Sequence, residues 1–305
     1  MSDETNAALA DPLNTSTDIL KNMVARMAPN IGRSATAIPG LFLTRWQDEA
    51  QSDVCFYAPA IGIILQGRKK SLIGSEDLEY GAQDCLVNGV DMPSSSKILE
   101  ASPEKPLLAV SLNIDRSLTT ELAAEISPPS GVKQTHLGVS VSRVPPEVIE
   151  AFVRLVELLD RPEQVQLRAP IIIREIITRV LVSPFGPALR MIYTLGSHSN
   201  QVAEAISWLR DNYTQPLSVE ALAARVGMPT STFHCQFKKV TSISPLQYQK
   251  CLRLYEAQRL MLTEDMDANN AGRAVGYDNV QQFNREYKRM FGEPPLRDIK
   301  RLRKE

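Results

Sequence analysis

A helical pattern with a central glycine occurs twice in the last third of the chain. Residues 218–240 read SVEALAARVGMPTSTFHCQFKKV, and residues 267–291 read DANNAGRAVGYDNVQQFNREYKRMF. Gly227 and Gly276 each separate two short amphipathic segments. A tight turn between helices requires the positive φ that glycine adopts at low cost. The sequence therefore predicts two helix–turn–helix units of the same build.

In the second helix of each unit, aromatic residues occupy one face and small or polar residues occupy the other. Phe233 and Phe237 are one turn apart, as are Phe283, Tyr287 and Phe291, so we expect these rings to be buried. Glutamine pairs with adenine and arginine with guanine in the major groove, whereas lysine binds phosphate. Ten residues on the opposite faces are expected to contact DNA: Ser231, Thr232, His234, Cys235 and Lys238 in the first unit, and Gln281, Gln282, Asn284, Arg285 and Lys288 in the second.

The segment between the two units is long and periodic enough to form one continuous helix, and it reads SPLQYQKCLRLYEAQRLMLTE. The two reading helices begin about fifty residues apart and could enter successive major grooves, ~34 Å apart on one side of the duplex. From Gly196 onward the chain has 16 Lys and Arg against 12 Asp and Glu, whereas residues 1–195 have 18 against 23. This imbalance favours a polyanionic partner for the second half only.

The first half of the chain has a different pattern. Short apolar or alternating runs such as LFLTRW and LLAVSLNI, separated by Gly, Pro, Asp and Asn, predict a small β-barrel or sandwich between Thr36 and Val144. Helical stripes begin after Pro145 and Pro146. We therefore expect an α+β chain of two domains. It divides into a polar tail with a short helix (1–30), a β-rich domain (31–144), a helical segment for linkage or dimerisation (145–195) and an all-α DNA-binding domain (196–305).

Several other kinds of protein are disfavoured by the sequence. Cys55, Cys85, Cys235 and Cys251 show no CxxC spacing, so neither a zinc site nor a disulfide scaffold is expected. The first residues lack the basic and apolar regions of a signal peptide, and no apolar run reaches the ~18 residues that a membrane span requires. These features predict a cytoplasmic protein with no membrane partner.

A set of motifs then occurs in a fixed order over the last hundred residues. They are the Ser-Pro-Leu-Gln-Tyr turn at 244–248, Arg253-Leu254 with Ala257, the Gly276-Tyr277 pair, and the run from Arg285-Glu286-Tyr287 through Phe291-Gly292 to Pro294-Pro295. These motifs resemble the DNA-binding domain of AraC/XylS-type transcriptional regulators. The resemblance implies two helix–turn–helix units that read adjacent major grooves of double-stranded DNA and recruit or block RNA polymerase. An activator is the expected form.

The N-terminal part resembles the cupin-like sensor domain found in one branch of that family. The resemblance rests on IPGLFL, on YAPAIGIILQGRKKSLIGSEDLEYGAQDCLVNGVDMP and on EASPEKPLLAVSLNID. It implies a cupin-like β-barrel that senses a small-molecule effector, followed by helices that form a homodimer. The apolar stripes between Pro146 and Tyr193 are the expected dimer interface.

The sequence also departs from the family pattern in the first unit. Pro229 and Thr230 stand where most relatives have Ser and then Pro, so we expect Thr230 to take over the capping role and shift the helix start by one residue. Cys235 stands where an arginine is common. The loss of that arginine weakens the case for strong base readout by the first unit.

Two alternatives for the N-terminal domain stay open at this stage. The first is a metal-independent cupin-type enzyme fused to a DNA-binding domain. Metal-dependent cupin chemistry needs two or three histidines with a carboxylate, and of the three histidines only His136 falls near the barrel, since His198 and His234 lie outside it. The second is a barrel that is purely a structural dimerisation module. We expect a sensor rather than an enzyme, with no catalytic residues, metal or cofactor, and Trp46, Phe56 and Tyr57 are the candidate ligand-binding residues.

Overall fold

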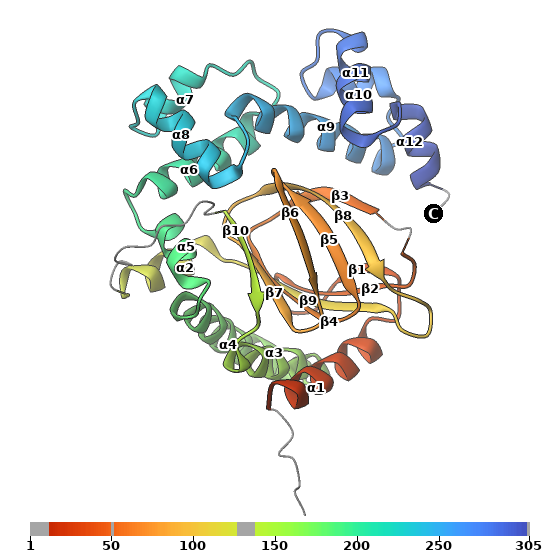
Figure 1. Ribbon diagram of the computed structural model, residues 1–305, viewed down its shortest axis with the longest axis vertical. Helices are drawn as coiled ribbons and strands as arrows, with labels where there is room; N and C mark the ends of the chain where they lie inside the picture. The colour runs from red at the N-terminus through yellow and green to blue at the C-terminus, as the bar shows by residue number, and fades with distance from the viewer. Residues whose placement is uncertain (1–11, 50–51, 127–137, 304–305) are drawn as a thin grey trace, which may run out of the picture.

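The computed structural model describes residues 12–49, 52–126 and 138–303, and it consists of an N-terminal α+β part and a C-terminal helical part (Figure 1). The strands all belong to the N-terminal part. The elements of that part are α1 (Pro12–Met27), β1 (Gly32–Ala35), β2 (Leu41–Trp46), β3 (Ser52–Tyr57), β4 (Ala60–Gln66), β5 (Arg68–Ile73), β6 (Glu76–Gly81), β7 (Asp84–Asn88), β8 (Met92–Glu100), β9 (Leu107–Asn113), α2 (Arg116–Ala124) and β10 (Val139–Arg143).

The strands form two sheets. A six-stranded sheet has the order β1-β2-β9-β4-β7-β10, and a four-stranded sheet has the order β3-β8-β5-β6. All of their pairings are antiparallel, and no strand of one sheet pairs with a strand of the other among the described residues. The two-domain α+β class is thus confirmed, but the expectation of a closed barrel is wrong. The chain leaves the large sheet through a register shift between Ile64 and Gln66 and through Gly67, whose φ is +83°, and it continues as β5 in the small sheet.

The large sheet buries its outer face against helices. Ile61, Ile63, Val110 and Leu112 are at most 1% exposed, and α1 contacts β2, β4 and β9 there. Strand alternation turns the neighbouring residues of β4 and β9 toward the small sheet instead. The apolar core of this part therefore lies between the large sheet and the helices, and not mainly between the two sheets.

The helical segment that follows is packed into the same core. It comprises α3 (Pro146–Glu157), the short 3₁₀ turn η1 (Leu158–Asp160), α4 (Pro162–Val182) and α5 (Gly186–Tyr193). Phe152 and Leu155 of α3 and Ile176 and Ile177 of α4 are completely buried. Because α3 lies against α1 and α4, the segment forms part of the N-terminal domain as well as a link to the next one.

The C-terminal part contains both predicted helix–turn–helix units, joined by one continuous helix as expected. Its elements are α6 (His198–Asn212), α7 (Val219–Arg225), α8 (Thr230–Thr241), α9 (Pro245–Thr263), α10 (Ala268–Ala274), α11 (Val280–Phe291) and α12 (Pro295–Leu302). The first unit is α7–α8, the second is α10–α11, and α9 connects them.

Two helices of the helix–turn–helix units begin with a side-chain cap, and α8 begins without one. Ser218 caps α7 by accepting a hydrogen bond from the backbone N–H of Ala221, and Asn279 caps α11 through Gln282. The expected cap at Thr230 is wrong, because α8 begins at Thr230 with Pro229 as its N-cap residue and no side-chain cap bond. Proline has no side-chain acceptor, but its fixed φ suits the residue that leads into a helix.

The two units differ in how their cores are joined to the rest of the molecule. Phe233, Phe237 and Val240 of α8 belong to one continuous apolar cluster that includes the core of the N-terminal domain. Phe283 and Tyr287 of α11 belong to a separate cluster with residues of α9, α10 and α12. The first unit is thus integrated with the N-terminal core, whereas the second is connected mainly through α9.

The two turn glycines should respond differently to alanine. Both have positive φ (+70° at Gly227, +90° at Gly276), but a Cβ at Gly276 would overlap the carbonyl oxygen of Thr214, whereas a Cβ at Gly227 would make only an ordinary contact with Gln201 at 3.7 Å. We expect Gly276→Ala to lower the free energy of unfolding by about 3 kcal/mol and Gly227→Ala by about 1 kcal/mol. Urea denaturation of the two variants measures the difference. Equal losses would show that backbone conformation alone, without steric overlap, determines the requirement for glycine.

Candidate nucleic-acid interface and internal cavity

The predicted reading face of α8 lies on the surface of the molecule. Ser231, His234, Cys235 and Lys238 are exposed, and Thr232 is half-buried. Phe233 and Phe237, on the opposite face, are completely buried with their ring centroids 5.4 Å apart. The helix is therefore anchored by its aromatic side, and its polar side is left open to a partner.

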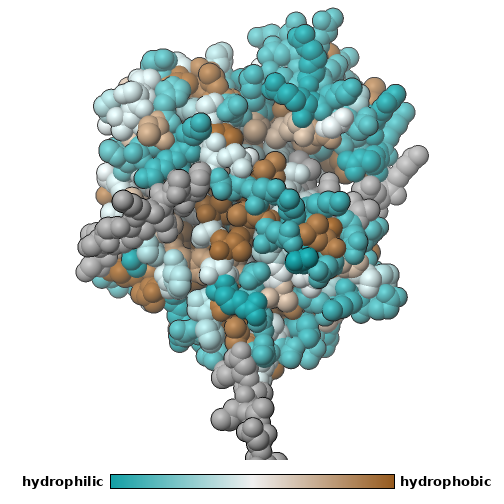
Figure 2. Space-filling model, in the orientation of Figure 1, coloured by the Kyte–Doolittle hydropathy of each residue, from teal (hydrophilic) through white to brown (hydrophobic). Residues whose placement is uncertain are grey.

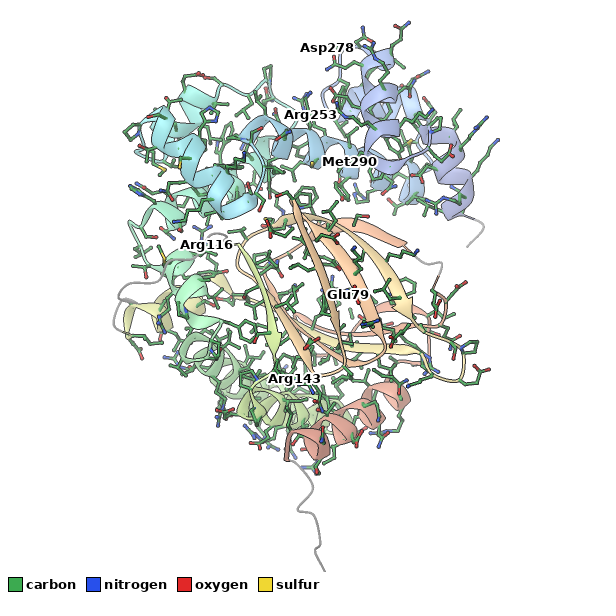
Figure 3. All side chains as sticks on the ribbon, viewed as in Figure 1. Glu79, Arg116, Arg143, Arg253, Asp278 and Met290 are labelled. Atoms are coloured by element: carbon green, nitrogen blue, oxygen red, sulfur yellow. The ribbon has the colours of Figure 1, made fainter. Side chains whose placement is uncertain are left out.

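The predicted reading face of α11 is also open. Its five residues, Gln281, Gln282, Asn284, Arg285 and Lys288, are all exposed. Phe283 and Tyr287 are fully buried on the other side, and Phe291 is partly buried against Tyr287. Figure 2 shows a predominantly hydrophilic surface over α10–α12. In Figure 3, Asp278, in the turn before α11, lies at the outer tip of this unit.

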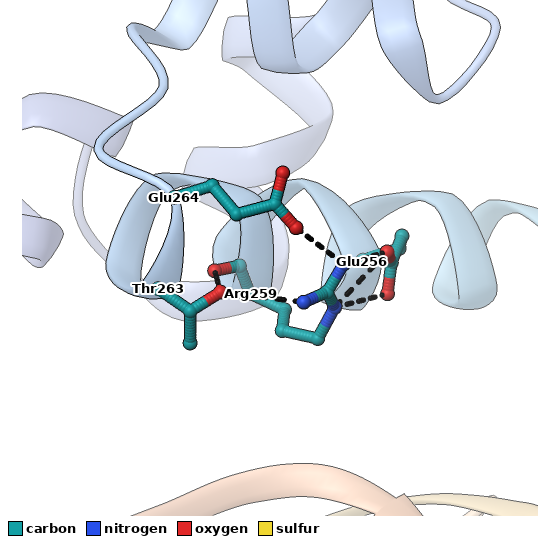
Figure 4. Close-up of polar contacts among 4 residues, drawn as sticks. All are labelled: Glu256, Arg259, Thr263 and Glu264. Atoms are coloured by element: carbon teal, nitrogen blue, oxygen red, sulfur yellow. Dashed lines mark hydrogen bonds and ion pairs between the residues drawn. The ribbon is translucent and has the colours of Figure 1, made fainter.

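Three cations on these faces lack the carboxylate partners that several other cations of the same domain have. Within the described parts of the chain, Lys238, Arg285 and Lys288 form no side-chain hydrogen bond or ion pair. Arg259, on α9, is by contrast held by Glu256 at 2.7 Å and by Glu264 at 3.1 Å (Figure 4). The unpaired cations are the ones that are available to phosphates or bases.

The one acid of α11 is turned away from this face. Glu286 accepts hydrogen bonds from Lys250 Nζ and from Tyr277 Oη, each at 2.8 Å, and a longer one from Gln282 Nε2 at 3.3 Å. Burial disfavours the carboxylate, but these donors outweigh it and hold the pKa of Glu286 below its ordinary value. The negative charge is thus compensated inside the protein, where it repels DNA less.

A cavity of about 130 Å³ lies in the N-terminal domain, between the two sheets. The wall formed by the large sheet carries small side chains where it faces the space, because Ala60 and Gly62 of β4 and Ala109 and Ser111 of β9 line it. Large residues on the opposite face of the same strands are buried against helices. The small residues therefore leave room between the sheets that no side chain fills.

The small sheet supplies a polar wall. Lys69 Nζ donates to Tyr57 Oη at 3.1 Å and lies 5.4 Å from the ring centroid of Tyr80. A chain of hydroxyl contacts continues from Tyr57 through Ser96 (2.7 Å) and Ser71 (2.8 Å) to Tyr80 (2.9 Å). Burial raises the pKa of Tyr80 to about 12, so its phenol stays neutral.

The candidate ligand residues from the sequence fall in two places. Trp46 and Tyr57 line the cavity, as does Lys69, which the sequence analysis missed. A pattern could have revealed Lys69, because β5 alternates exposed Arg68, Lys70 and Leu72 with inward-facing residues, and a lysine occupies one of the inward positions.

Phe56 lies outside the cavity lining and packs on the connecting helix α9. Its ring is edge-on to Tyr248 at 5.6 Å and to Tyr255 at 5.0 Å. The hydroxyls of Tyr248 and Tyr255 donate to the backbone oxygens of Asp91 (2.7 Å) and Ser94 (2.8 Å). Adjacent residues of β3 thus face different neighbours, with Tyr57 at the cavity and Phe56 on α9.

The cysteines and histidines form neither a disulfide nor a metal-binding cluster among the described residues. Cys85, Cys235 and Cys251 are free, and no cluster of three or more His, Cys, Asp or Glu could hold a metal ion there. His198 and His234 are exposed on α6 and α8. His136 and the side chain of Cys55 lie outside what the structure describes. Over the same residues, no helix combines the length and the apolarity needed to cross a bilayer.

Comparison with known proteins identifies both halves. Residues 37–188 match the family model of the AraC-type transcriptional regulator N-terminus, and residues 222–301 match a helix–turn–helix domain model. The chain belongs to the AraC/XylS-type regulators. The helix–turn–helix units predicted from the glycines and aromatic spacings are therefore those of this family.

Curated relatives match the AraC-type chain over about a third of its length. The HTH-type transcriptional activator RhaS of Pectobacterium carotovorum is 30% identical over 100 residues, which are 33% of this chain and 36% of the relative. RhaS of Escherichia fergusonii is 32% identical over 98 residues, which are 32% and 35% of the two chains. The matches thus span about a third of the length of these curated relatives.

Solved structures of ToxT share the fold over most of the AraC-type chain. ToxT from Vibrio cholerae, crystallised with a bound unsaturated fatty acid, aligns with a TM-score of 0.57 over 86% of this chain and 95% of its own, at 9% identity. At this identity the likeness shows the fold alone.

Two neighbouring cations of α11 should contribute differently to DNA binding. Arg285 can pair bidentately with guanine, so Arg285→Ala should cost about 1–3 kcal/mol of binding to the preferred site and relax selection at one base position. Lys288→Ala should weaken binding to all sequences about equally, because lysine acts on phosphate as a point charge. Binding to the selected site and to a randomised library measures both effects. A uniform loss for Arg285→Ala would assign Arg285 to the phosphate backbone.

Proposed function

We propose that this protein is a sequence-specific DNA-binding transcriptional regulator whose N-terminal domain binds a small-molecule effector. The observation that carries the proposal is the pair of like-built units, α7–α8 and α10–α11, each presenting an exposed polar helix face on a buried aromatic base. The unpaired cations Lys238, Arg285 and Lys288 on these faces fit a phosphate-rich partner. The ten predicted residues from Ser231 to Lys288 form the proposed DNA contact surface.

Activation of transcription, with RNA polymerase as a partner, is the proposed mode of action. The curated relatives that share the DNA-binding domain are described as transcriptional activators. Because the family consists of transcriptional regulators, we propose the same role here in place of the enzyme alternative. A protein that acts on promoter DNA works where the chromosome lies, so we propose a cytoplasmic location.

The cavity favours an effector-binding domain over a purely structural one. Its space of about 130 Å³ is bordered by Lys69, Tyr57 and Trp46, and protein interiors leave few voids larger than a water molecule. A ligand there would touch Tyr57 on β3, whose neighbour Phe56 packs on α9. We propose that ligand binding changes how β3 holds α9 and so alters the placement of the two reading helices.

Selection of genomic fragments by the full-length protein tests the proposed function. We expect a small set of fragments to be enriched, and we expect affinity for them to fall at least about tenfold between about 50 and 200 mM salt, because phosphate contacts release counterions. Gel-shift or fluorescence titrations at several salt concentrations measure this. Absence of enrichment for any fragment, or an affinity that does not depend on salt, would contradict the proposal.

A homodimer is part of the proposal, and α4 offers the surface. Leu167, Ile171 and Val182 are 77%, 69% and 65% exposed. The spacings i, i+4 and i+15 place them along one stripe of this helix. The other apolar residues of α4, such as Ile172 and Ile176, are buried in the domain. Of the apolar residues predicted to form the dimer interface, most are thus buried in the domain core, and a smaller number are exposed.

Replacement of one exposed residue should therefore dissociate the dimer. Ile171→Glu places a charge in the proposed apolar contact, and we expect the protein to sediment as a monomer at micromolar concentration while keeping its melting temperature. Leu296→Glu is the matched control, because Leu296 is 65% exposed on α12 of the DNA-binding domain. A dimer that persists in Ile171→Glu would exclude this stripe as the interface.

A further inference from the structure

The cavity between the two sheets has two chemically different walls. The central strands β4 and β9 of the large sheet contribute the small apolar residues Ala60, Gly62 and Ala109, and the strands around them add the polar residues Arg33, Thr44 and Asn88. The small sheet contributes Lys69, Tyr57 and Tyr80, which present an ammonium group and two phenols. A molecule that fills the space therefore needs an apolar body and a polar group directed at the small sheet.

The cation in the polar wall has only neutral partners. Lys69 donates to Tyr57 Oη, and its Nζ lies 5.5 Å from the ring centroid of Tyr57 and 5.4 Å from that of Tyr80. In the portion of the chain that the structure describes, no carboxylate lies within ion-pair distance of Lys69, whereas its neighbours Arg68 and Lys70 are paired with Glu79 and Asp77. A charge withdrawn from water is costly unless an opposite charge compensates it.

The size of the space limits the occupant. The cavity volume is about 130 Å³. An apolar protein cavity of about 150 Å³ accommodates benzene. The apolar body of the occupant therefore corresponds to one ring or a short branched chain. Trp46, also in the lining, provides an aromatic surface for such a body.

We propose that this cavity binds a small organic acid with a single ring or a short branched chain, and that Lys69 pairs with its carboxylate. The proposal rests on the proposed effector-binding function and names the chemical class of the effector. The ammonium and the phenol of Tyr57 form the recognition site for the acid group, and the small residues of β4 and β9 leave the space for its apolar body.

Matched acids and amides test the charge requirement with the wild-type protein. The full-length chain is titrated calorimetrically, without DNA, with benzoate and benzamide, phenylacetate and phenylacetamide, and cyclohexanecarboxylate and its amide. Each pair has nearly the same shape and differs in charge. We expect at least one acid to bind roughly tenfold or more tightly than its amide, because a hydrogen bond between charged groups is stronger than a neutral one. Equal affinities within every pair, or no binding by any acid, would overturn the proposal.

Two lysine variants test whether Lys69 causes the preference for acids over amides. Lys69→Met keeps the length of the side chain and removes the charge, so the preference for the acid should fall to within about twofold of the amide. Lys70→Met is the matched control, because Lys70 is exposed on the opposite face of β5 and pairs with Asp77; it should keep the wild-type preference. If Lys69→Met retains the full preference, the acid binds elsewhere and the proposal is overturned.

The outcome is separable from that of the proposed function. Acid binding is measured without DNA, and fragment selection is measured without acid. Failure to enrich any DNA fragment removes the regulator proposal and leaves the acid-binding result standing. If calorimetry shows no preference for acids over their amides while fragment selection is normal, only the assignment of the effector class is excluded. If Lys69→Met does not fold, the comparison of acid with amide in the wild type still decides the question.

Discussion

The guanidinium group of Arg253 ties the link between α6 and α7 to the turn of the second helix–turn–helix unit. From the middle of α9 it donates hydrogen bonds to the backbone oxygens of Tyr213 (2.7 Å) and Gln215 (3.0 Å), which follow α6, and to that of Gly276 (2.8 Å), in the turn of the second unit. In Figure 3 it lies on α9 between the two units. Carbonyls at the ends of helices lack backbone partners, and one planar group with five donors satisfies several of them at once. The contact thus joins the entry to the first unit, α9 and the turn of the second unit.

The same helix also fixes the DNA-binding domain on the N-terminal domain. Tyr248 and Tyr255 are two turns apart on α9, and Phe56 of β3 packs between them. Their hydroxyls donate to the backbone oxygens of Asp91, just before β8, and of Ser94, within β8. Arg210 of α6 adds an ion pair with Asp91 at 2.6 Å. Because α9 is shared by all of these contacts, a change in the β3–β8 edge reaches both reading helices through a single rigid element. Binding of the proposed effector can therefore change DNA binding through α9 itself, without a separate signalling segment.

The C-terminal domain could be predicted from the sequence because its determinants are local. Gly227 and Gly276 mark the turns, Ser218 and Asn279 mark helix starts, and the aromatic spacing of α8 and α11 fixes which face is buried. The expected cap at Thr230 failed because it treated capping as obligatory, whereas α8 begins without a side-chain cap. Local rules were thus sufficient for the fold of these units, with one helix end as the exception.

The N-terminal domain was less predictable because its determinants are long-range. Whether strands close into a barrel depends on pairings between distant segments, and the switch of the chain from β4 to β5 at Gly67 separates two sheets that the strand pattern alone does not distinguish. The role of Lys69 likewise depends on Tyr57, Tyr80 and Ser96, which come from three other strands. The sequence pointed to Trp46 and Tyr57 at the cavity, but the position of Phe56 against α9 required the docking of the second domain.

The two reading helices are chemically unequal, and the shared helix α9 explains how both can still serve one site. The face of α8 carries Ser231, His234, Cys235 and Lys238, with no arginine or glutamine on it for bidentate base contacts, whereas α11 carries Arg285 and two glutamines. On the proposed function, α11 contributes more of the base readout and α8 more of the backbone contact. Because α9 holds the units in a fixed relation, binding of α11 to its bases places α8 at the neighbouring groove at a high effective concentration. A weakly selective first unit therefore still adds to the affinity for DNA. A shift of α9 by the N-terminal domain would change the spacing of α8 and α11 and so lower the contribution of both units.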